Sequence, residues 1–394
     1  NPAEPSIPQT TMNTRFETIV VGTGGFGSSC LFHLASRGVK VLGLDRFPAG
    51  HDQGSSHGDT RIIRQAYFEH PDYVPLLLRA YALWRDLEAW SERDLMKICG
   101  LFLAGPPAGE AVAGTRLAAK SHGLEVENVS AADLAKDGGA RFPGFRIPDG
   151  FDVVMEPAGG YLHVEDCVRT HIDLACKAGA EHRCGEAIIG WESDGRTIRV
   201  RTESEEYEAA SLILTPGAWA NHLLDSIPGM PTFRVLRKTM HWNRVRSDVY
   251  NTDNGGQGFF FEMPYGVFYG FPSLDGSSLK LAEHSGGDAI TDPLQIDHTL
   301  QTSDTDPISR FVSEVMPDLD PQTDRHSVCM YTVTPDGHFI VDRHPEYSNV
   351  FFGAGFSGHG FKFTSVLGEA LGELALFGTS DLPIEFLGLA RFRS

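Results

Sequence analysis

The sequence predicts an α/β protein of two parts: a Rossmann-like nucleotide-binding part, and a second part built on an antiparallel sheet that interrupts it. Three observations support this prediction. A glycine-rich strand–helix–strand pattern opens the chain, aromatic segments with alternating polarity fill residues 229–320, and strand–turn–helix texture returns near the C-terminus. The length of 394 residues exceeds one ordinary hydrophobic core, which agrees with two parts.

The strongest local signal is the segment FETIVVGTGGFGSSCLFHLASRG. Residues 16–21 predict a buried strand, and a helix that ends at Gly38 follows it. Between them lie Gly22, Gly24 and Gly27 in the pattern G-x-G-x-x-G. Glycines at these positions let backbone N–H groups approach a pyrophosphate, whose charge is stabilised by the start of the helix. The segment therefore predicts a dinucleotide site.

The next segment, VKVLGLD, predicts a second strand that ends at Asp45. An acid at this position is placed to accept hydrogen bonds from ribose hydroxyls. It favours FAD or NAD over NADP, because NADP would need a basic residue for its additional phosphate. Arg46 follows directly and weakens that preference.

A polar, glycine-rich segment, GSSHGDTRIIRQAY, occupies residues 54–67. Arg61 and Arg64 are three residues apart, so they share one side of the segment if it forms a helical turn. A solvated surface turn is the simpler interpretation. In an acidic chain, however, two arginines beside a cofactor site favour an anion as their partner.

The middle of the chain has a sequence pattern typical of antiparallel strands. SLILTPGAW predicts a buried strand that runs into a second glycine turn, at Gly217. HWNRVRS, GFFFEMPYGVFYGFPS and SLKLAEH predict aromatic-rich antiparallel strands, a sheet suited to cover a flat cofactor. Alternation places Lys280 and Ala282 on one face, with His284 next along it. Lys280 could instead lie on an edge strand and point into water.

Near the C-terminus, NVFFGAG predicts a strand, FSGHG a third glycine turn, and FKFTSVLGEALGELALFG a helix. Glycine turns spread over the whole chain indicate one cofactor held by discontinuous segments, which favours an FAD-binding domain of the glutathione-reductase type over a contiguous nicotinamide domain. We expect an FAD-binding domain of residues 14–104, 151–226 and 335–394, and a substrate domain of residues 105–150 and 227–334.

The charge of the chain restricts its partners. Asp and Glu outnumber Lys and Arg by 52 to 33, and the formal net charge is −19. A negative surface repels phosphate backbones and anionic lipids, so we expect neither a nucleic acid nor a membrane as partner. No apolar run approaches the roughly 20 residues of a membrane helix. An anionic substrate would need Arg or Lys in its own site.

Two further features favour a cytoplasmic protein. Residues 1–13 lack the basic start and apolar middle of a signal peptide, and we expect them to form a disordered leader. The cysteines have neither the spacing of a disulfide framework nor that of metal ligands, so free thiols and no metal site are expected. They are Cys30, Cys99, Cys167, Cys176, Cys184 and Cys329.

From about Phe16 to about Gly378 the chain resembles the family of monomeric sarcosine oxidase and N-methyltryptophan oxidase, FAD-dependent amine oxidases of the D-amino-acid-oxidase-like superfamily. GSSHGDTRIIR, CMYT and GFSGHGFKF occur in that family's order and spacing. The resemblance implies that the cysteine of CMYT, Cys329, is bonded to the 8α-methyl group of FAD. Because a thiolate is the nucleophile, Cys329 should be reactive and lie near cationic groups.

The resemblance also implies roles by position. Lys280 corresponds to the lysine that activates oxygen, Arg61 to the arginine beside the flavin ring, and Arg64 and Lys362 to the pair that holds the substrate carboxylate. Tyr269, His284, Tyr331 and His359 resemble the residues around the substrate amine, and Phe260 the wall of the pocket. The expected cofactor contacts are Gly22, Gly24, Gly27, Asp45, Arg46, Ser56, His57, Thr60, Arg61, Gly217, Trp219, Cys329, Gly355, Gly358, His359, Gly360 and Lys362.

The implied reaction is oxidation of a small anionic secondary amine, with hydride transfer to FAD, hydrolysis of the imine and reduction of O₂ to H₂O₂. Sarcosine is the default substrate. Phe260 stands where the sarcosine branch has a less rigid methionine, so a cyclic secondary amino acid such as pipecolate or proline, or an N-methyl aminophosphonate, stays open. An FAD dehydrogenase with a different acceptor, an NAD-dependent dehydrogenase and a dinucleotide-binding sensor are competing hypotheses. The family name suggests a monomer.

Overall fold

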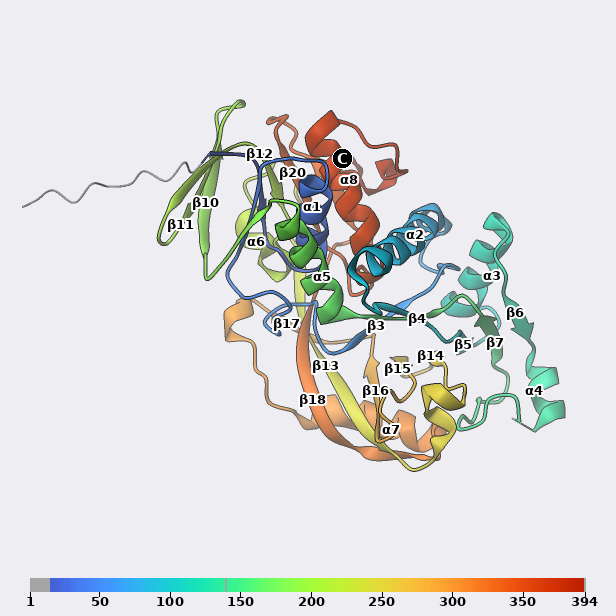
Figure 1. Cartoon of the computed structure of the whole chain (residues 1–394). Helices are drawn as coiled ribbons and strands as arrows, with labels where there is room; N and C mark the ends of the chain where they lie inside the picture. Colours follow the sequence, from blue (N-terminus) through green and yellow to red (C-terminus); the bar gives the residue numbers. More distant parts are fainter. Residues whose placement is uncertain (1–14, 139, 393–394) are drawn as a thin grey trace, which may run out of the picture.

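The computed structural model describes residues 15–138 and 140–392 (Figure 1). Two large sheets dominate these residues, one in the upper and one in the lower half of Figure 1. The leader expected at residues 1–13 lies outside the described residues. The predicted mixed α/β fold is confirmed.

The first sheet has eight strands in the described part of the chain. Strands β2, β1, β12 and β20 run parallel, as expected for the nucleotide-binding part, and β10 and β11 extend it as an antiparallel ribbon. The buried run Ile19–Val21 explains why β1 occupies the centre of this sheet. The strands are β1 (Arg15–Val21), β2 (Val41–Asp45), β9 (Glu181–Cys184), β10 (Ile188–Ser193), β11 (Ile198–Thr202), β12 (Glu206–Leu214), β19 (Ile340–Arg343) and β20 (Val350–Ala354).

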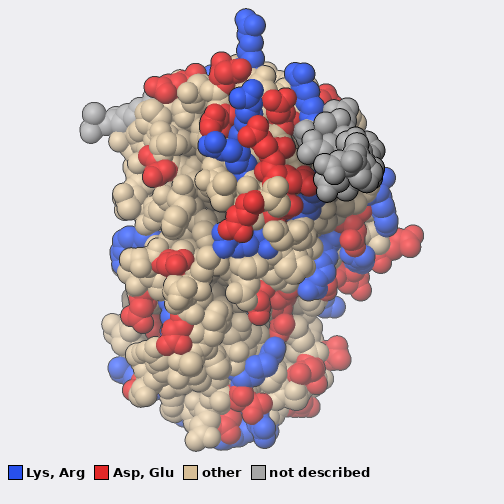
Figure 2. Space-filling view, turned by 90° about the vertical axis from the view of Figure 1, so that its left-hand side faces the viewer, with Lys and Arg blue, Asp and Glu red and all other residues tan. Residues whose placement is uncertain are grey.

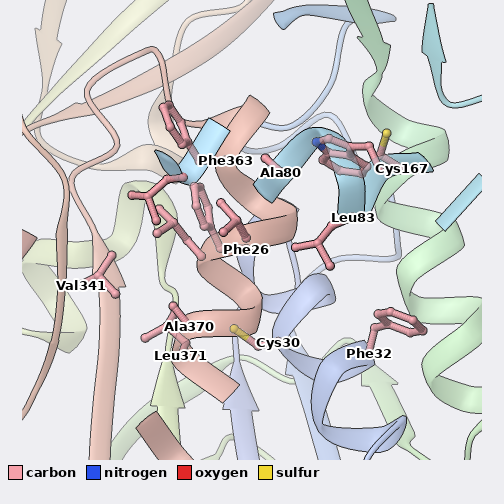
Figure 3. Close-up of a cluster of buried hydrophobic side chains, with 14 of the residues drawn as sticks. Phe26, Cys30, Phe32, Ala80, Leu83, Cys167, Val341, Phe363, Ala370 and Leu371 are labelled. Atoms are coloured by element: carbon pink, nitrogen blue, oxygen red, sulfur yellow. The ribbon is translucent and has the colours of Figure 1, made fainter. Parts of the chain in front are cut away.

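Helices cover one face of this sheet and form its main hydrophobic core. Helix α1 (Gly25–Ala35), which ends three residues before Gly38, packs against α5 (Val164–Lys177) and α8 (Thr364–Phe377). Figure 3 shows the apolar side chains that α1, α8 and α2 (Val74–Ser91) contribute to this core. A Cβ on Gly368 of α8 would lie 2.2 Å from Oγ of Ser29, so the glycine permits the close approach of α8 to α1.

The second sheet has nine strands among the described residues, and its two faces differ. Phe259 and Phe261 of β14 pack with Phe311 of α7 (Thr302–Val315), which covers one face. Phe260, between them, belongs to a separate cluster on the other face with Cys329. The strands are β5 (Leu101–Gly105), β6 (Glu127–Val129), β7 (Asp152–Glu156), β13 (Arg234–Val245), β14 (Gly258–Met263), β15 (Gly266–Gly270), β16 (Ser278–Glu283), β17 (Asp288–Ile290) and β18 (Leu319–Val333).

A small third sheet joins β3 (Thr60–Ile63), β8 (Gly160–His163) and β4 (Met96–Ile98). The helical turn considered for Arg61 and Arg64 is therefore wrong, because β3 pairs with β8 as a strand. The β-branched residues of TRII favour this strand. The remaining α-helices among the described residues are α3 (Glu110–His122), α4 (Ala131–Asp137) and α6 (Ala220–Leu223).

The sheets suggest a refinement of the expected domains. Strands β5 and β7 pair with each other in the nine-stranded sheet, whereas the expected boundaries place most of β5 and all of β7 in the FAD-binding domain. We propose the same discontinuous division with both strands assigned to the substrate domain.

Acidic and basic side chains are interleaved on the face shown in Figure 2. Over β10, β11 and β12 they form exposed ion pairs, such as Arg201–Glu192 at 2.7 Å and Arg199–Glu208 at 3.3 Å. Exposed pairs of this kind contribute little to stability individually. Among the described residues, no helix is long and apolar enough to cross a membrane.

Candidate active site

A cavity of about 330 Å³ is lined by residues of both large sheets. Most of the predicted site residues line it, although they come from segments far apart in the sequence. Those in the lining are Gly22, Gly24, Asp45, Arg46, Ser56, Arg61, Arg64, Gly217, Trp219, Phe260, Tyr269, His284, Tyr331, Gly355, Gly358, His359, Gly360 and Lys362. The predicted residues outside the lining are Gly27, His57, Thr60, Lys280 and Cys329.

The first glycine turn brings backbone to the start of α1. Gly22 has φ +84°, and a Cβ there would lie 2.4 Å from the carbonyl oxygen of Thr215. A Cβ on Gly27 would lie 1.7 Å from the carbonyl oxygen of Gly22, so no other residue fits without moving the turn. Gly24 has room, since the nearest atom to its Cβ would be Oγ of Ser56 at 3.9 Å. The turn thus leaves space at Gly24 for a ligand above the helix N-terminus.

Asp45 ends β2 beside this turn and is nine-tenths buried. One carboxylate oxygen accepts from the backbone N–H of Thr23 at 2.6 Å, and the other accepts from the N–H of Phe47 at 2.9 Å. These bonds fix the carboxylate at the cavity wall, where it retains capacity to accept a hydroxyl of a ligand.

The other two glycine turns lie along the same cavity. Gly217, with φ +54°, opens the turn Gly217–Trp219, and Gly358, with φ +81°, precedes α8. The buried hydroxyls of Thr332 and Thr364 have no hydrogen-bond partner among the described residues, and Thr332 lines the cavity. Buried hydroxyls normally have a partner. Together with the glycine cradle and Asp45, they make the cavity fit a dinucleotide such as FAD.

Two buried cations face the cavity. Arg64 is 4% exposed and donates to Glu69 at 2.5 Å, and its guanidinium stacks over the ring of Phe68 at 4.1 Å. Lys362 is 6% exposed, and its Nζ donates to the carbonyl oxygen of His359 at 2.7 Å. Burial, together with the charge of Arg64, lowers the pKa of Lys362 to about 7. Burial raises the pKa of Glu69, but Arg64, His359 and Lys362 outweigh it and lower that pKa to about 2.

The histidines beside these cations are held neutral. Burial is the main cause that lowers the pKa of His359 to about 3 and that of His284 to about 4. His359 shares a hydrogen bond with the hydroxyl of Tyr67, and Nδ1 of His284 lies 3.4 Å from the hydroxyl of Tyr331. Burial raises the pKa of Tyr269. This end of the cavity therefore offers neutral acceptors and hydroxyls beside two cationic groups.

Lys280 is buried, at 4% exposed, so its side chain does not point into water. Its Nζ donates to the carbonyl oxygens of Gly58 and of Thr60, the latter at 2.6 Å, and lies 4.8 Å from the ring centre of Phe271. Burial, with Arg61 nearby, lowers the pKa of Lys280 well below its ordinary value. The amino group of Lys280 is thus fixed behind β3, beside the cavity.

Cys329 is 3% exposed and lies among cations. Burial raises the pKa of its thiol, and Arg61, Lys280 and Lys238 oppose that effect. Arg61 is fixed by the carbonyl oxygens of Thr60 and Ser55, each at 2.9 Å. All six cysteines are free.

His57, like Thr332 and Thr364, has a buried polar atom without a hydrogen-bond partner among the described residues. It is 2% exposed, and Nδ1 lies 3.4 Å from Oγ of Ser327, while Nε2 has no partner among the described residues. Burial and the charge of Arg61 lower the pKa of His57 to about 3.

Sequence reasoning missed several residues of the site and its surroundings, and three of them bear on its chemistry: Phe68, Glu69 and Lys238. Phe68 lines the cavity and contacts the ring of Phe260, with centroids 5.1 Å apart, and Glu69 pairs with Arg64. Both directly follow the arginine-containing segment. Glu69 could have been predicted, because it is an acid close in the sequence to the arginines of a predicted anion site. Lys238 had no local signal, because its proximity to Cys329 comes from strand pairing.

Comparisons with known proteins show the family of the chain. The family described as FAD dependent oxidoreductase (DAO) matches residues 17–374. Monomeric sarcosine oxidase of Bacillus sp. (strain B-0618) is 38% identical over 96% of this chain and 97% of its own length. N-methyl-L-tryptophan oxidase of Yersinia pestis (strain Pestoides F) is 33% identical over 96% of this chain and 100% of its own length.

Solved structures show the same fold. NikD, an unusual amino acid oxidase essential for nikkomycin biosynthesis, aligns in its open form with a TM-score of 0.82 at 24% identity, over 95% of this chain and 97% of its own. L-proline dehydrogenase from P. horikoshii aligns with a TM-score of 0.81 at 20% identity, over 96% and 98%. By sequence over nearly its full length, the chain belongs to the monomeric sarcosine oxidase and N-methyltryptophan oxidase family of FAD-dependent oxidoreductases.

Proposed function

We propose that this protein is an FAD-dependent oxidase of a small secondary amino acid, with sarcosine as the default substrate and O₂ as the electron acceptor. One observation supports the substrate class above all others. Arg64 and Lys362 are both buried, both line the cavity and come from opposite ends of the chain. Buried cations are costly unless an anion compensates them, and a guanidinium can grip a carboxylate with two hydrogen bonds.

In this proposal the chain orients the substrate through its carboxylate. Lys362 has no carboxylate within ion-pair distance among the described residues, so it is available to a substrate anion. The guanidinium of Arg64 would bind both that anion and the carboxylate of Glu69. The neutral imidazole of His284 can accept a hydrogen bond from the substrate amine. The cations Arg64 and Lys362 disfavour a further positive charge beside them, which favours the neutral, reactive form of the amine.

When bound, FAD supplies the acceptor for the hydride of the C–H bond next to the amine nitrogen and passes the electrons to O₂. The aromatic residues Phe260 and Tyr269 exclude water from the side of the cavity where that bond would lie. The imine product hydrolyses in water, so sarcosine would give glycine, formaldehyde and H₂O₂.

Two further roles belong to this proposal. Cys329 holds FAD by a thioether to the 8α carbon, and the ammonium of Lys280 stabilises the negative charge that develops on O₂. Acid precipitation tests the first: the wild-type pellet stays yellow, and the Cys329→Ser pellet is colourless. A colourless wild-type pellet would contradict covalent attachment. The name of the sarcosine oxidases supports a monomer, and a cytoplasmic location stays a prediction from the sequence.

The substrate is tested by anaerobic bleaching of the flavin with sarcosine, N-methyl-L-amino acids, L-proline, L-pipecolate, glycine and an N-methyl aminophosphonate. Fast bleaching by sarcosine supports the default. Bleaching by a cyclic or phosphonate-bearing amine, but not by sarcosine, would support the same reaction with that amine as the substrate. The absence of bleaching by every secondary amine in the set would contradict the proposal.

A further inference from the structure

Lys238, in the middle of β13, is a buried lysine to which the proposed reaction gives no task. It is 6% exposed, and its Nζ donates to the carbonyl oxygen of Ser285 at 2.5 Å. Within residues 15–138 and 140–392, no carboxylate lies within ion-pair distance of this Nζ, although Glu283 is near enough to raise its pKa against the lowering effect of burial. A buried charge without an ion-pair partner is destabilising, so its presence calls for a compensating interaction.

Strand pairing places Lys238 directly opposite Cys329. In the antiparallel pair of β13 and β18, Lys238 faces Cys329, and the neighbouring pairs are Leu236 with Tyr331 and Met240 with Ser327. Directly opposite residues project from the same face of a sheet, with Cβ atoms about 4.5–5.5 Å apart. That face belongs to the cavity side, because Cys329 packs there with Met240 and Trp242.

The surroundings of Cys329 are positive. The ionisable groups that face it come from every strand packed around it: Arg61 of β3, Lys280 of β16, Lys238 of β13, Tyr269 of β15 and Tyr331 of β18. Burial raises the pKa of the thiol, Arg61 and the two lysines lower it, and the two tyrosines are neutral because burial raises their own pKa values.

The three cations differ in what else holds them. Lys280 is fixed by the carbonyl oxygens of Gly58 and Thr60, and Arg61 lines the cavity itself. Lys238 lies outside the lining, on the side of Tyr331 where its Nζ is 5.6 Å from the ring centre. A cation in this position acts on the thiol without contacting a ligand in the cavity.

We propose that Lys238 promotes the attachment of FAD by stabilising the thiolate of Cys329, from directly across the sheet. This inference rests on the proposed covalent bond at Cys329. In the attachment, the S–H bond of Cys329 and one C–H bond of the 8α-methyl group are broken and an S–C bond forms. The two protons and two electrons released pass to O₂ and form H₂O₂, so the step is balanced with O₂ as the oxidant. Lys238 lowers the free energy of the first event, loss of the thiol proton.

Three variants separate charge from structure. Lys238→Arg keeps a cation and a donor to Ser285, Lys238→Gln keeps a donor without the charge, and Lys238→Met removes both. Each apoprotein is mixed with FAD in air, and acid-stable flavin is measured against time at several pH values. In a second measurement without FAD, the rate of Cys329 alkylation by iodoacetamide is followed against pH by peptide mass spectrometry, with exposed Cys176 as internal control.

We expect attachment about tenfold slower in Lys238→Gln and Lys238→Met than in the wild type, and near the wild-type rate in Lys238→Arg. The pH dependence of alkylation should shift upward by about one unit in the two neutral variants, which corresponds to the same tenfold loss of thiolate. Melting temperature and retention of non-covalent FAD control for folding.

Wild-type attachment and an unshifted alkylation profile in Lys238→Gln would overturn the inference and leave Lys238 as a structural donor to Ser285. If only the alkylation profile shifts while attachment keeps its wild-type rate, the thiolate does not limit attachment, and the inference is likewise wrong. If the wild type itself forms no acid-stable flavin, the covalent bond proposed for Cys329 fails instead.

Discussion

The pKa of Lys362 gives a quantitative prediction for ligand binding. Burial and the charge of Arg64 lower this pKa from its ordinary 10.5 to about 7, a destabilisation of the ammonium of about 5 kcal/mol. A carboxylate binds the ammonium and not the neutral amine. The protonated fraction falls from about nine-tenths at pH 6 to about one-tenth at pH 8, so the affinity for a carboxylate should fall about tenfold over this range.

The titratable neighbours of Lys362 at this end of the cavity have pKa values outside that window. The pKa values of His359, His284 and Glu69 lie at about 3, 4 and 2, and burial raises that of Tyr269. The assay is a titration of flavin absorbance with methoxyacetate, which carries a carboxylate but no amine, at pH values from 6 to 8.

Two variants serve as matched controls for Lys362. Lys362→Arg keeps its charge throughout the range, so its affinity should be independent of pH, and Lys362→Met should bind weakly and also without pH dependence. A wild-type affinity that changes less than about twofold, or a tenfold change that persists in Lys362→Met, would refute the assignment of the titration to Lys362.

Three further outcomes follow from the site. Lys280→Met should slow reoxidation of reduced flavin by O₂ about 100-fold or more, with reduction by substrate within about twofold, as stopped-flow absorbance would show. Gly27→Ala should cost about 3 kcal/mol or more in unfolding free energy, because its Cβ would lie 1.7 Å from the oxygen of Gly22, whereas Gly24→Ala should melt like the wild type. Phe260→Met should lower KM for bulkier N-methyl amino acids about tenfold. An unchanged KM would show that Phe260 does not determine substrate specificity.

Much of the fold follows from local sequence patterns. The G-x-G-x-x-G turn predicts β1, α1 and β2, because strand hydrophobicity, glycine geometry and the terminal acid are all short-range features. The aromatic strands of the second sheet likewise follow from alternation, and the structure places Phe260 and its neighbours on opposite faces. The boundaries between the parts are less predictable, since β5 and β7 join the second sheet through partners far away in the sequence.

Contacts between distant segments also limit how much of the site can be predicted from the sequence. The resemblance points to Arg64, Lys362 and Cys329 because their motifs are contiguous. The partner of Arg64 and the neighbour of Cys329 depend on packing and strand register, which no local pattern specifies. Glu69 is paired because Arg64 is buried beside it, and Lys238 faces Cys329 only once β13 and β18 are aligned.

The most direct test of the account is to reduce the flavin anaerobically with sarcosine and then admit O₂ to the same sample. The account predicts rapid bleaching, followed by full return of the flavin colour with one H₂O₂ formed for each flavin reoxidised. Bleaching without return in O₂ would identify a dehydrogenase with another acceptor. The absence of bleaching by sarcosine and by every other secondary amino acid would contradict the central claim that this chain is a secondary-amine oxidase.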